Sequence, residues 1–428
     1  MKILWLVNIV MPELSEHLGG KASVFGGWLS GALQAVRGSG SELVVVTNQV
    51  PAKQPGRYDV NGVRYYITAG AEEASMRAAF REILAVEQPD VIHLYGTEFE
   101  QCWAMAQEAD PARTLVTVQG LVSYCIHHVR GGVPEAVCRD TWLHRLLRRL
   151  NRGGESIEQQ RQRFEARAEA EIKTLKRVRY INGGTAWGTA CTELINPTAR
   201  QLPCELILRD SFYSEERWSY DGCEKHSIFT LYSVPLKGFD MLLRAMPLIL
   251  ERFPDAKVYV MANKCKYRSY TGLRRRVMDK APDYDWYIQS LIEKYDLKKH
   301  LVFCGFMGEQ SVKARLLKSH VFVSASCIEN HSTALGEAMI TGVPSVASCV
   351  GGLQEMVDHG EDGFLYPFDE PYMLAWYICK LFSDRALAER FSQKGQLHAN
   401  RTFNRDDNKR RLLAMYDIVS KEQKEANQ

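Results

Sequence analysis

Three features are scarce in this sequence, and each absence narrows the class of protein. No stretch of its 428 residues contains the roughly 18 consecutive apolar residues that a membrane-spanning helix needs. None of the 11 cysteines forms a C-x-x-C pair or a Cys/His cluster with zinc-ligand spacing. Neither charge sign dominates, because 54 Lys and Arg residues nearly balance 51 Asp and Glu residues. We therefore predict a chain without a spanning helix or zinc site, and one that does not bind nucleic acid.

The cysteines and the apolar start of the chain bear on its location. Free, buried thiols are typical of a reducing cytoplasm, and an odd number of cysteines fits that state. Residues 1–10 superficially resemble a signal peptide, but they carry one positive charge and lack a clear small-x-small cleavage site. We interpret them as a buried strand and predict a cytoplasmic protein, with peripheral association with the cytoplasmic membrane face left open.

Short apolar runs alternate with longer helical stretches along the chain. The runs are nearly continuous and rich in β-branched residues, as in strands covered on both faces. Alternation of such strands with helices predicts βαβ units and parallel sheets. The expected strands are 2–9, 42–47, 90–95, 114–119 and 178–181, followed by 227–232, 257–261, 301–304, 321–325 and 344–347. The expected helices are 24–36, 75–86, 239–253, 286–295, 309–318, 331–341 and 405–419.

The restart of this pattern after residue 226 predicts two successive parallel-sheet domains, each of an ordinary size. We expect an N-terminal domain over 1–200 and a C-terminal domain over 201–400. A last helix and tail over 401–428 could pack back on the first domain. Ligands of open parallel sheets bind beyond the carboxyl ends of the strands, so the residues after each strand are the candidates for function.

The segment 324–339, S-A-S-C-I-E-N-H-S-T-A-L-G-E-A-M, carries the strongest signal. A strand ends near Ala325, a loop holds Glu329, and a helix begins near His331 and carries Glu337. Free backbone amides at a helix start, here near Ser332 and Thr333, form a natural phosphate site. Carboxylates in the loop and on the helix could accept hydrogen bonds from sugar and ribose hydroxyls.

This segment resembles glycosyltransferase family 4 (glycosyltransferase group 1), the retaining enzymes of the GT-B fold. The family signature is two glutamates separated by seven residues, present here as Glu329 and Glu337. The motifs G-V-P-S-V-A-S, G-G-L-Q-E and G-E-D-G-F-L follow at the family's spacing. The resemblance implies an α/β fold of two Rossmann-like domains facing across a cleft, with the N-terminal domain on the acceptor side and the C-terminal domain binding the nucleotide-sugar. It covers about 229–384, is diffuse over the first half, and is similar to bacterial surface-polysaccharide and capsule enzymes.

A second match is P-L-K-G-F-D, in which the resemblance implies that Lys237 meets the donor diphosphate. A cation near a helix start is otherwise unfavourable, which favours a functional role over a solvated one. Many relatives carry an arginine five residues earlier, where this chain has Tyr232. Basic residues after the next strand could replace that arginine, although charge runs are usually solvated; they are Lys264, Lys266 and Arg268.

The first half gives weaker candidates. Relatives place a glycine pair after the first strand, where backbone passes close to the donor phosphates, and Gly26 and Gly27 fit that place. Many relatives carry histidine where Gln119 stands; glutamine can hydrogen-bond a sugar hydroxyl but carries no proton at neutral pH. His93 also lies at a strand end and is either a sugar or acceptor contact or a core histidine.

Two further segments allow both a functional and a structural interpretation. The helix expected over 141–150 carries four leucines on one face and is flanked by arginines and Trp142, so it would either lie on an anionic membrane or pack on its own domain. The D-x-D of Asp283 and Asp285 looks like a metal motif of another glycosyltransferase fold. Its position just before a helix favours an electrostatic role at the helix start instead, so no metal is expected.

Together these residues predict a retaining glycosyltransferase, of the hexosyltransferase type, that moves a sugar from a UDP- or GDP-sugar to a glycan or lipid-linked glycan. Glu329 and Lys237 would act at the reacting centre, and no cofactor is expected. Donor contacts would come from Glu337, Ser332, Thr333, Gly26 and Gly27. Two alternatives remain, a nucleotide-sugar epimerase of the same fold and a non-catalytic scaffold subunit.

Overall fold

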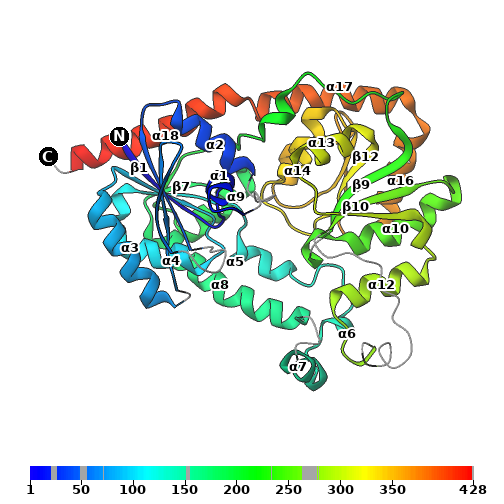
Figure 1. Ribbon diagram of the computed structural model, residues 1–428. Coiled ribbons are helices and arrows are strands. Elements are labelled where there is room, and N and C mark those ends of the chain that lie inside the picture. Colours follow the sequence, from blue (N-terminus) through cyan, green and yellow to red (C-terminus); the bar gives the residue numbers. More distant parts are fainter. Residues whose placement is uncertain are drawn as a thin grey trace. The chain divides into compact units, whose positions relative to one another are not determined.

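The computed structural model describes residues 1–20, 27–48, 55–70, 72–150, 155–232, 234–262, 277 and 279–426. The chain divides into two compact units (Figure 1). The first unit comprises Met1–Tyr124, Glu165–Asp210 and Thr402–Gln428, and the second comprises Cys125–Phe164 and Ser211–Arg401. The expected N-terminal domain 1–200 therefore differs from the first unit, because Cys125–Phe164 groups with the second unit. Among the described residues, no helix is both long and apolar enough to cross a membrane.

The first unit is built on an eight-stranded sheet in the order β3-β4-β2-β1-β5-β6-β7-β8. Its strands pair in parallel, except that β3 and β4 form an antiparallel hairpin. The strands are β1 (Lys2–Val7), β2 (Glu42–Thr47), β3 (Gly56–Val60), β4 (Val63–Ile67), β5 (Val91–Tyr95), β6 (Thr114–Thr117), β7 (Tyr180–Asn182) and β8 (Arg200–Gln201).

Helices cover both faces of this sheet, which explains its continuous apolar strands. Ile3 and Trp5 of β1 belong to one apolar core, and Leu4 and Leu6 belong to another. Successive side chains of a strand point to opposite faces, so each core lies on its own side of the sheet. The helices are α1 (Pro12–His17), α2 (Gly27–Arg37), α3 (Glu73–Glu87), α4 (Glu100–Glu108), α5 (Val122–Cys125), α8 (Ile157–Arg177), α9 (Ala186–Ile195) and α18 (Arg405–Ala426).

The second unit contains a six-stranded, all-parallel sheet in the order β11-β10-β9-β12-β13-β14. Its strands are β9 (Glu224–Tyr232), β10 (Lys257–Ala262), β11 (Leu301–Gly305), β12 (Ser319–Ser324), β13 (Ser345–Ser348) and β14 (Phe364–Tyr366). Its helices are α6 (Glu135–Cys138), α7 (Trp142–Arg149), α10 (Phe239–Arg252), α12 (Tyr284–Lys294), α13 (Glu309–Lys318), α14 (Thr333–Thr341), α15 (Leu353–Met356), α16 (Pro371–Ser383) and α17 (Arg385–Thr402).

All ten strands and all eight helices expected from the sequence are present, with ends shifted by a few residues. The β3–β4 hairpin and the short strands β8 and β14 are additions. The hairpin turns at Asn61 and Gly62, which both have positive φ, as a tight two-residue turn requires.

Each sheet has one topological switch point, where the chain order of the strands reverses. In the first sheet β1 lies between β2 and β5, and the reversal falls between β1 and β5. In the second sheet β9 lies between β10 and β12, and the reversal falls between β9 and β12. The connections after these strands leave in opposite directions and open a crevice in which ligands of such sheets bind.

Candidate functional site

Lys237 and Glu329 form an ion pair at the switch point of the second sheet. Lys237 lies in a short helical turn after β9, and Glu329 lies in the loop after β12. The Lys237 Nζ donates to Glu329 Oε2 over 2.6 Å, and the Ser326 Oγ donates to the same oxygen over 2.9 Å. Burial acts to lower the pKa of Lys237, but the Glu329 carboxylate outweighs it and the pKa lies above its ordinary value.

Two glycines fix the loops that carry this pair. Gly238 follows Lys237 with a φ of +61°, and a Cβ there would lie 1.8 Å from the Ala325 carbonyl oxygen. Gly351 has a φ of +48°, and a Cβ there would lie 2.1 Å from the Glu329 carbonyl oxygen. The K-G and G-G-L-Q-E motifs therefore supply backbone that only glycine can adopt so close to the Glu329 loop.

The helix after Glu329 begins as the sequence predicts, and Ser332 is its N-cap. The Ser332 Oγ accepts a hydrogen bond from the amide of Leu335 over 3.3 Å, and α14 begins at Thr333. Amides of a first helical turn have no acceptor within the helix, so this end can bind a phosphate. Glu337 lies one turn further along and is buried. The structure thus joins Lys237 and Glu329 directly, and places Ser332, Thr333 and Glu337 on the helix that follows.

Sequence reasoning missed two contributors to this site. Ser326 is one, and its position just after a buried strand was the available signal. The other is the loop around Gly131, in which a Cβ at Gly131 would lie 2.8 Å from the Pro235 carbonyl oxygen. The Cys327 Sγ donates to the His128 carbonyl over 3.4 Å. This loop therefore packs against the connections after both β9 and β12, which explains why Cys125–Phe164 belongs to the second unit.

The candidates of the first unit have different surroundings. His93 is fully buried; its Nδ1 lies 2.8 Å from the Tyr416 hydroxyl and its Nε2 lies 2.7 Å from Thr117 Oγ1. Burial lowers the pKa of His93 well below its usual range. Both ring nitrogens are engaged, so of the two interpretations of His93 the structure supports the core histidine and not the sugar or acceptor contact.

Gln119 follows β6 and is half-buried, and its Oε1 accepts a hydrogen bond from Asn8 Nδ2 over 3.2 Å. Gly27 is the first residue of α2, and a Cβ there would lie 2.3 Å from Arg209 Cδ. The close neighbour of Gly27 is thus an arginine side chain. Gly26 lies outside the described residues.

Other expectations from the sequence are resolved in part. The Asp283 carboxylate accepts from the Trp286 amide over 2.8 Å as the N-cap of α12, which confirms the helix-start interpretation of the D-x-D. The side chain of Tyr232 lies outside the described part of the chain, as do Lys264, Lys266 and Arg268. The source of a second cation for a diphosphate therefore stays a prediction.

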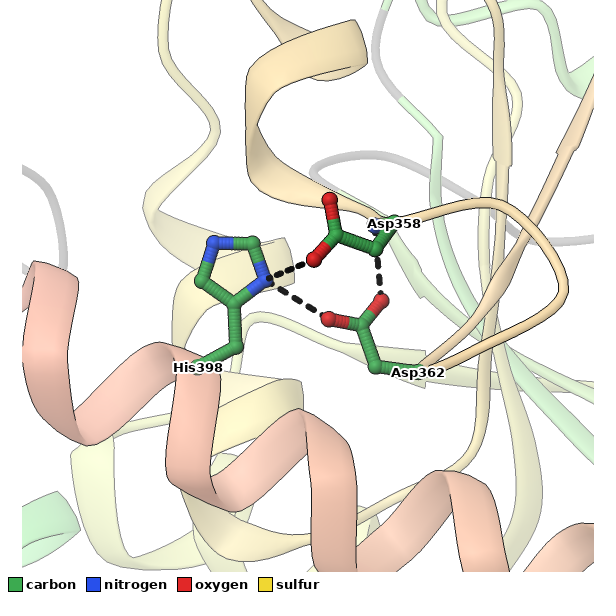
Figure 2. A group of neighbouring side chains, drawn as sticks. All are labelled: Asp358, Asp362 and His398. Carbon is green, nitrogen blue, oxygen red and sulfur yellow. Dashed lines mark hydrogen bonds and ion pairs between the residues drawn. The ribbon is translucent and has the colours of Figure 1, made fainter.

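Two aspartates in and beside the G-E-D-G-F-L motif lie against a histidine of α17 (Figure 2). Asp358, Asp362 and His398 place potential metal-ligand atoms within 4.8 Å of one another. The His398 Nδ1 lies 2.6 Å from Asp362 Oδ2, and Asp362 Oδ1 accepts from the Asp358 amide over 2.8 Å. The hydrogen bond that His398 donates to the Asp362 carboxylate raises the pKa of His398. Since the contacts within the protein engage both Asp362 oxygens, we interpret this group as a clamp on the loop.

Comparisons with known proteins agree with this geometry. Residues 225–398 match the family model of glycosyl transferases group 1. The chain is 28% identical over 197 residues to an uncharacterized glycosyltransferase of Methanocaldococcus jannaschii, which is 46% of this chain and 45% of that protein. The match thus spans about half the length of that relative.

Two solved structures resemble nearly the whole chain. Sucrose-phosphate synthase from Thermosynechococcus elongatus has a TM-score of 0.71 at 18% identity and 98% coverage of both chains. Anabaena HepE in complex with UDP-glucose has a TM-score of 0.67 at 13% identity, with 97% of this chain and 99% of that chain covered. At these identities the likeness shows the fold, and it confirms the predicted fold class of two parallel-sheet α/β domains.

Proposed function

The chain has the GT-B fold, and on that premise we propose that it is a retaining glycosyltransferase that transfers a sugar from a nucleotide-sugar donor. The observation that supports this most is the Lys237–Glu329 pair at the switch point of the second sheet, inside the segment that matches glycosyl transferases group 1. A cation and a carboxylate at a crevice are suited to a ligand that carries both a diphosphate and sugar hydroxyls.

In the proposed mechanism the donor separates the ion pair, and Lys237 and Glu329 each bind a group of the donor instead of each other. The Lys237 ammonium and the first-turn amides of α14 would hold the diphosphate, where positive charge stabilises the leaving group as negative charge develops. Glu329 would accept hydrogen bonds from the transferred sugar, and Glu337 would bind the ribose. The acceptor hydroxyl would attack from the face that the leaving phosphate vacates, and that phosphate would take its proton. We propose no metal or other cofactor for this step.

The donor can be identified by thermal shifts and calorimetry of the full chain with UDP, GDP and ADP, with and without EDTA. A ligand at 100 times its Kd adds about 2.7 kcal/mol to the free energy of unfolding. We expect one nucleoside diphosphate to stabilise the chain without a metal, and Lys237→Ala to abolish that stabilisation. If no nucleotide binds in either assay, the scaffold alternative replaces this proposal. If a donor sugar isomerises without transfer, the epimerase alternative does.

For the acceptor we propose a glycan or lipid-linked glycan of polysaccharide biosynthesis, bound at the cytoplasmic face of a membrane. The supporting observation is helix α7 with the residue that follows it: Trp142 and Leu146 on the helix and Leu150 just after it are 69%, 42% and 55% exposed. These residues recur every four positions and share a face with the exposed Arg145 and Arg149. Of the two interpretations of this helix, packing of all four leucines on the domain does not hold for Leu146 and Leu150.

The opposite face of α7 holds the helix on the second unit. His144 is buried, and its Nε2 lies 3.1 Å from the carbonyl oxygen of Pro282. An anchored helix with an outward tryptophan, two outward leucines and two arginines matches the chemistry of an anionic bilayer surface.

Flotation with vesicles of phosphatidylglycerol tests this contact, and vesicles of phosphatidylcholine are the control. We expect binding to the anionic vesicles only, and loss of binding in Trp142→Ser and Leu146→Ser. Matched variants at exposed apolar residues elsewhere, Trp376→Ser on α16 and Leu397→Ser on α17, are expected to bind normally. Equal binding by all four variants would contradict the membrane contact.

A further inference from the structure

The switch point of the first sheet carries a polar group that the proposed donor site does not use. Asn8 follows β1, Glu98 follows β5 and Gln119 follows β6, so three neighbouring strands each contribute one side chain. The Asn8 Nδ2 lies 3.4 Å from Glu98 Oε1 and 3.2 Å from Gln119 Oε1. The Asn8 side-chain amide therefore donates to both neighbours, the Glu98 carboxyl and the Gln119 carboxamide.

Two atoms of this group lack partners. The Glu98 Oε2 and the Gln119 Nε2 are shielded from solvent and have no hydrogen-bond partner among the described residues. Buried polar groups are nearly always hydrogen-bonded, so each such atom calls for a ligand or a water. One of the two accepts and the other donates, which matches a hydroxyl group, since a hydroxyl does both.

The backbone is shaped to hold the carboxyl in place. Gly96 precedes the loop with a φ of +81°, and a Cβ there would lie 2.8 Å from Glu98 Oε2 and 3.0 Å from Asn8 Nδ2. Asn8, Glu98 and Gln119 are each half-buried, so the group lies at the edge of the sheet rather than within the core. The terminal torsions of carboxyl and carboxamide groups are soft, so both can turn toward a bound molecule.

Burial, more than the surrounding charges, favours the neutral form of Glu98. Burial raises the pKa of Glu98 to about 8, and Glu171 on α8 acts in the same direction. Arg167 on α8 and the Glu98 amide act in the opposite direction and do not offset the burial. Cys102 on α4 faces the same group, and burial raises the pKa of its thiol. At pH 7 the carboxyl therefore donates as well as accepts hydrogen bonds.

We propose that Asn8, Glu98 and Gln119 form a binding site for the hydroxyl groups of an uncharged sugar, and that this sugar is the acceptor. The assignment of the bound sugar as the acceptor rests on the proposed function, whereas the hydroxyl site itself rests on the geometry of the first sheet. A second carboxylate, Glu171, accepts hydrogen bonds from Thr97 and Ser123 next to this group. Burial raises the pKa of Glu171 as it does that of Glu98, and a phosphorylated sugar would bring a negative charge into the same buried surroundings, so the site selects against it.

The test measures sugar binding separately from donor binding. Saturation-transfer NMR titrations of the full chain use methyl α-D-glucopyranoside as the uncharged probe and glucose 6-phosphate as its anionic counterpart. We expect the uncharged probe to bind at least about tenfold more tightly than the phosphate, because taking a charged phosphate group out of water is costly. Glu98→Ala and Gln119→Ala are each expected to weaken the uncharged probe by at least about tenfold.

Two controls separate a binding role from a structural one. Glu98→Gln keeps a group that donates and accepts, so it is expected to bind the probe within about threefold of the unchanged chain. Glu100→Ala removes an exposed carboxylate two residues away and is expected to have no effect. Equal probe affinity in the unchanged chain and Glu98→Ala, including no binding to either, overturns the proposal, and so does tighter binding of glucose 6-phosphate.

Thermal shifts with the nucleoside diphosphates keep this result distinct from the donor site. Sugar binding that depends on Glu98, in a chain that binds no nucleotide, would retain the hydroxyl site and refute the glycosyltransferase proposal. If every variant binds nucleotide normally and sugar binding does not depend on Glu98, the glycosyltransferase proposal stands and the hydroxyl site is refuted.

Discussion

The two switch points of the molecule compensate charge in different ways. In the second sheet a carboxylate meets a lysine at 2.6 Å, and a serine hydroxyl completes its contacts. In the first sheet the Glu98 carboxyl lies at hydrogen-bonding distance from the Asn8 amide, and one of its oxygens has no partner within the described part of the chain. An ion pair can be exchanged for a charged ligand, because each partner can be replaced by a ligand group of the same sign. A neutral carboxyl among amides is suited to uncharged hydroxyls. The difference teaches that one fold can present a charged and an uncharged polar site at topologically equivalent places.

The largest effect is expected when either partner of the Lys237–Glu329 ion pair is removed. Glu329→Ala and Lys237→Ala are each expected to lower the rate of sugar transfer by at least about 100-fold, as for loss of a group that stabilises charge in the transition state. Melting curves by circular dichroism check that both variants stay folded. The exposed pair of Lys394 and Glu361 supplies the control, since Glu361→Ala is expected to leave transfer unchanged. Near-normal transfer by a folded Glu329→Ala variant would sink the assignment of the pair.

The backbone that brings the pair together is the next point to test. Gly238→Ala combines a left-handed φ with a Cβ 1.8 Å from a carbonyl oxygen, so it is expected to cost about 3 kcal/mol or more in the free energy of unfolding. Gly360→Ala has a φ of +81° with nothing within 4 Å of its Cβ, so only the conformational cost of about 1–2 kcal/mol is expected. Urea denaturation measures both, and equal costs would show that the Ala325 loop moves away freely.

Glu98, the carboxyl of the first sheet that has no cationic partner at hydrogen-bonding distance among the described residues, should make the free energy of unfolding depend on pH. The unfolded chain ionises Glu98 near its ordinary pKa, whereas the folded chain does so at about 8. Its contribution to stability is therefore complete below the ordinary value and is lost as the pH rises to about 8. The slope is at most about 1.4 kcal/mol per pH unit. Glu98→Gln removes it, so the variant is expected to gain stability relative to the unchanged chain between pH 5 and 8. Parallel curves for the two proteins would show that Glu98 is ionised when folded.

The smallest effect is expected for His398 and Asp362, an ion pair that lies away from both switch points. The pKa of His398 is raised by its hydrogen bond to Asp362, so the pair contributes most below the ordinary histidine pKa and loses that contribution as the pH rises through the folded value. His398→Gln is expected to lower the Tm more at pH 5.5 than at pH 8.5. A Tm difference that is constant with pH would mean that His398 is neutral in the folded chain.

The sequence predicts most of the second site because its determinants are local. Lys237 and Glu329 each follow a buried strand within a few residues, and the glycines that fix their loops are adjacent in the same motifs. His93 was ambiguous because its partner Tyr416 lies 323 residues further along the chain. The loop around Gly131 could not be assigned to the second unit, since nothing in its own sequence names Pro235 as a neighbour. The β3–β4 hairpin did carry a readable signal, the Asn61-Gly62 turn between alternating residues.

The division of the chain has a consequence for the core of the first unit. The first unit joins segments from both sides of the second unit, because α18 supplies Leu412, Met415 and Tyr416 to a core that also contains Trp5 of β1. The Trp5 indole nitrogen donates to the Tyr416 hydroxyl over 3.0 Å. That core of the first unit is therefore incomplete without α18, a helix that the chain reaches only after every residue of the second unit.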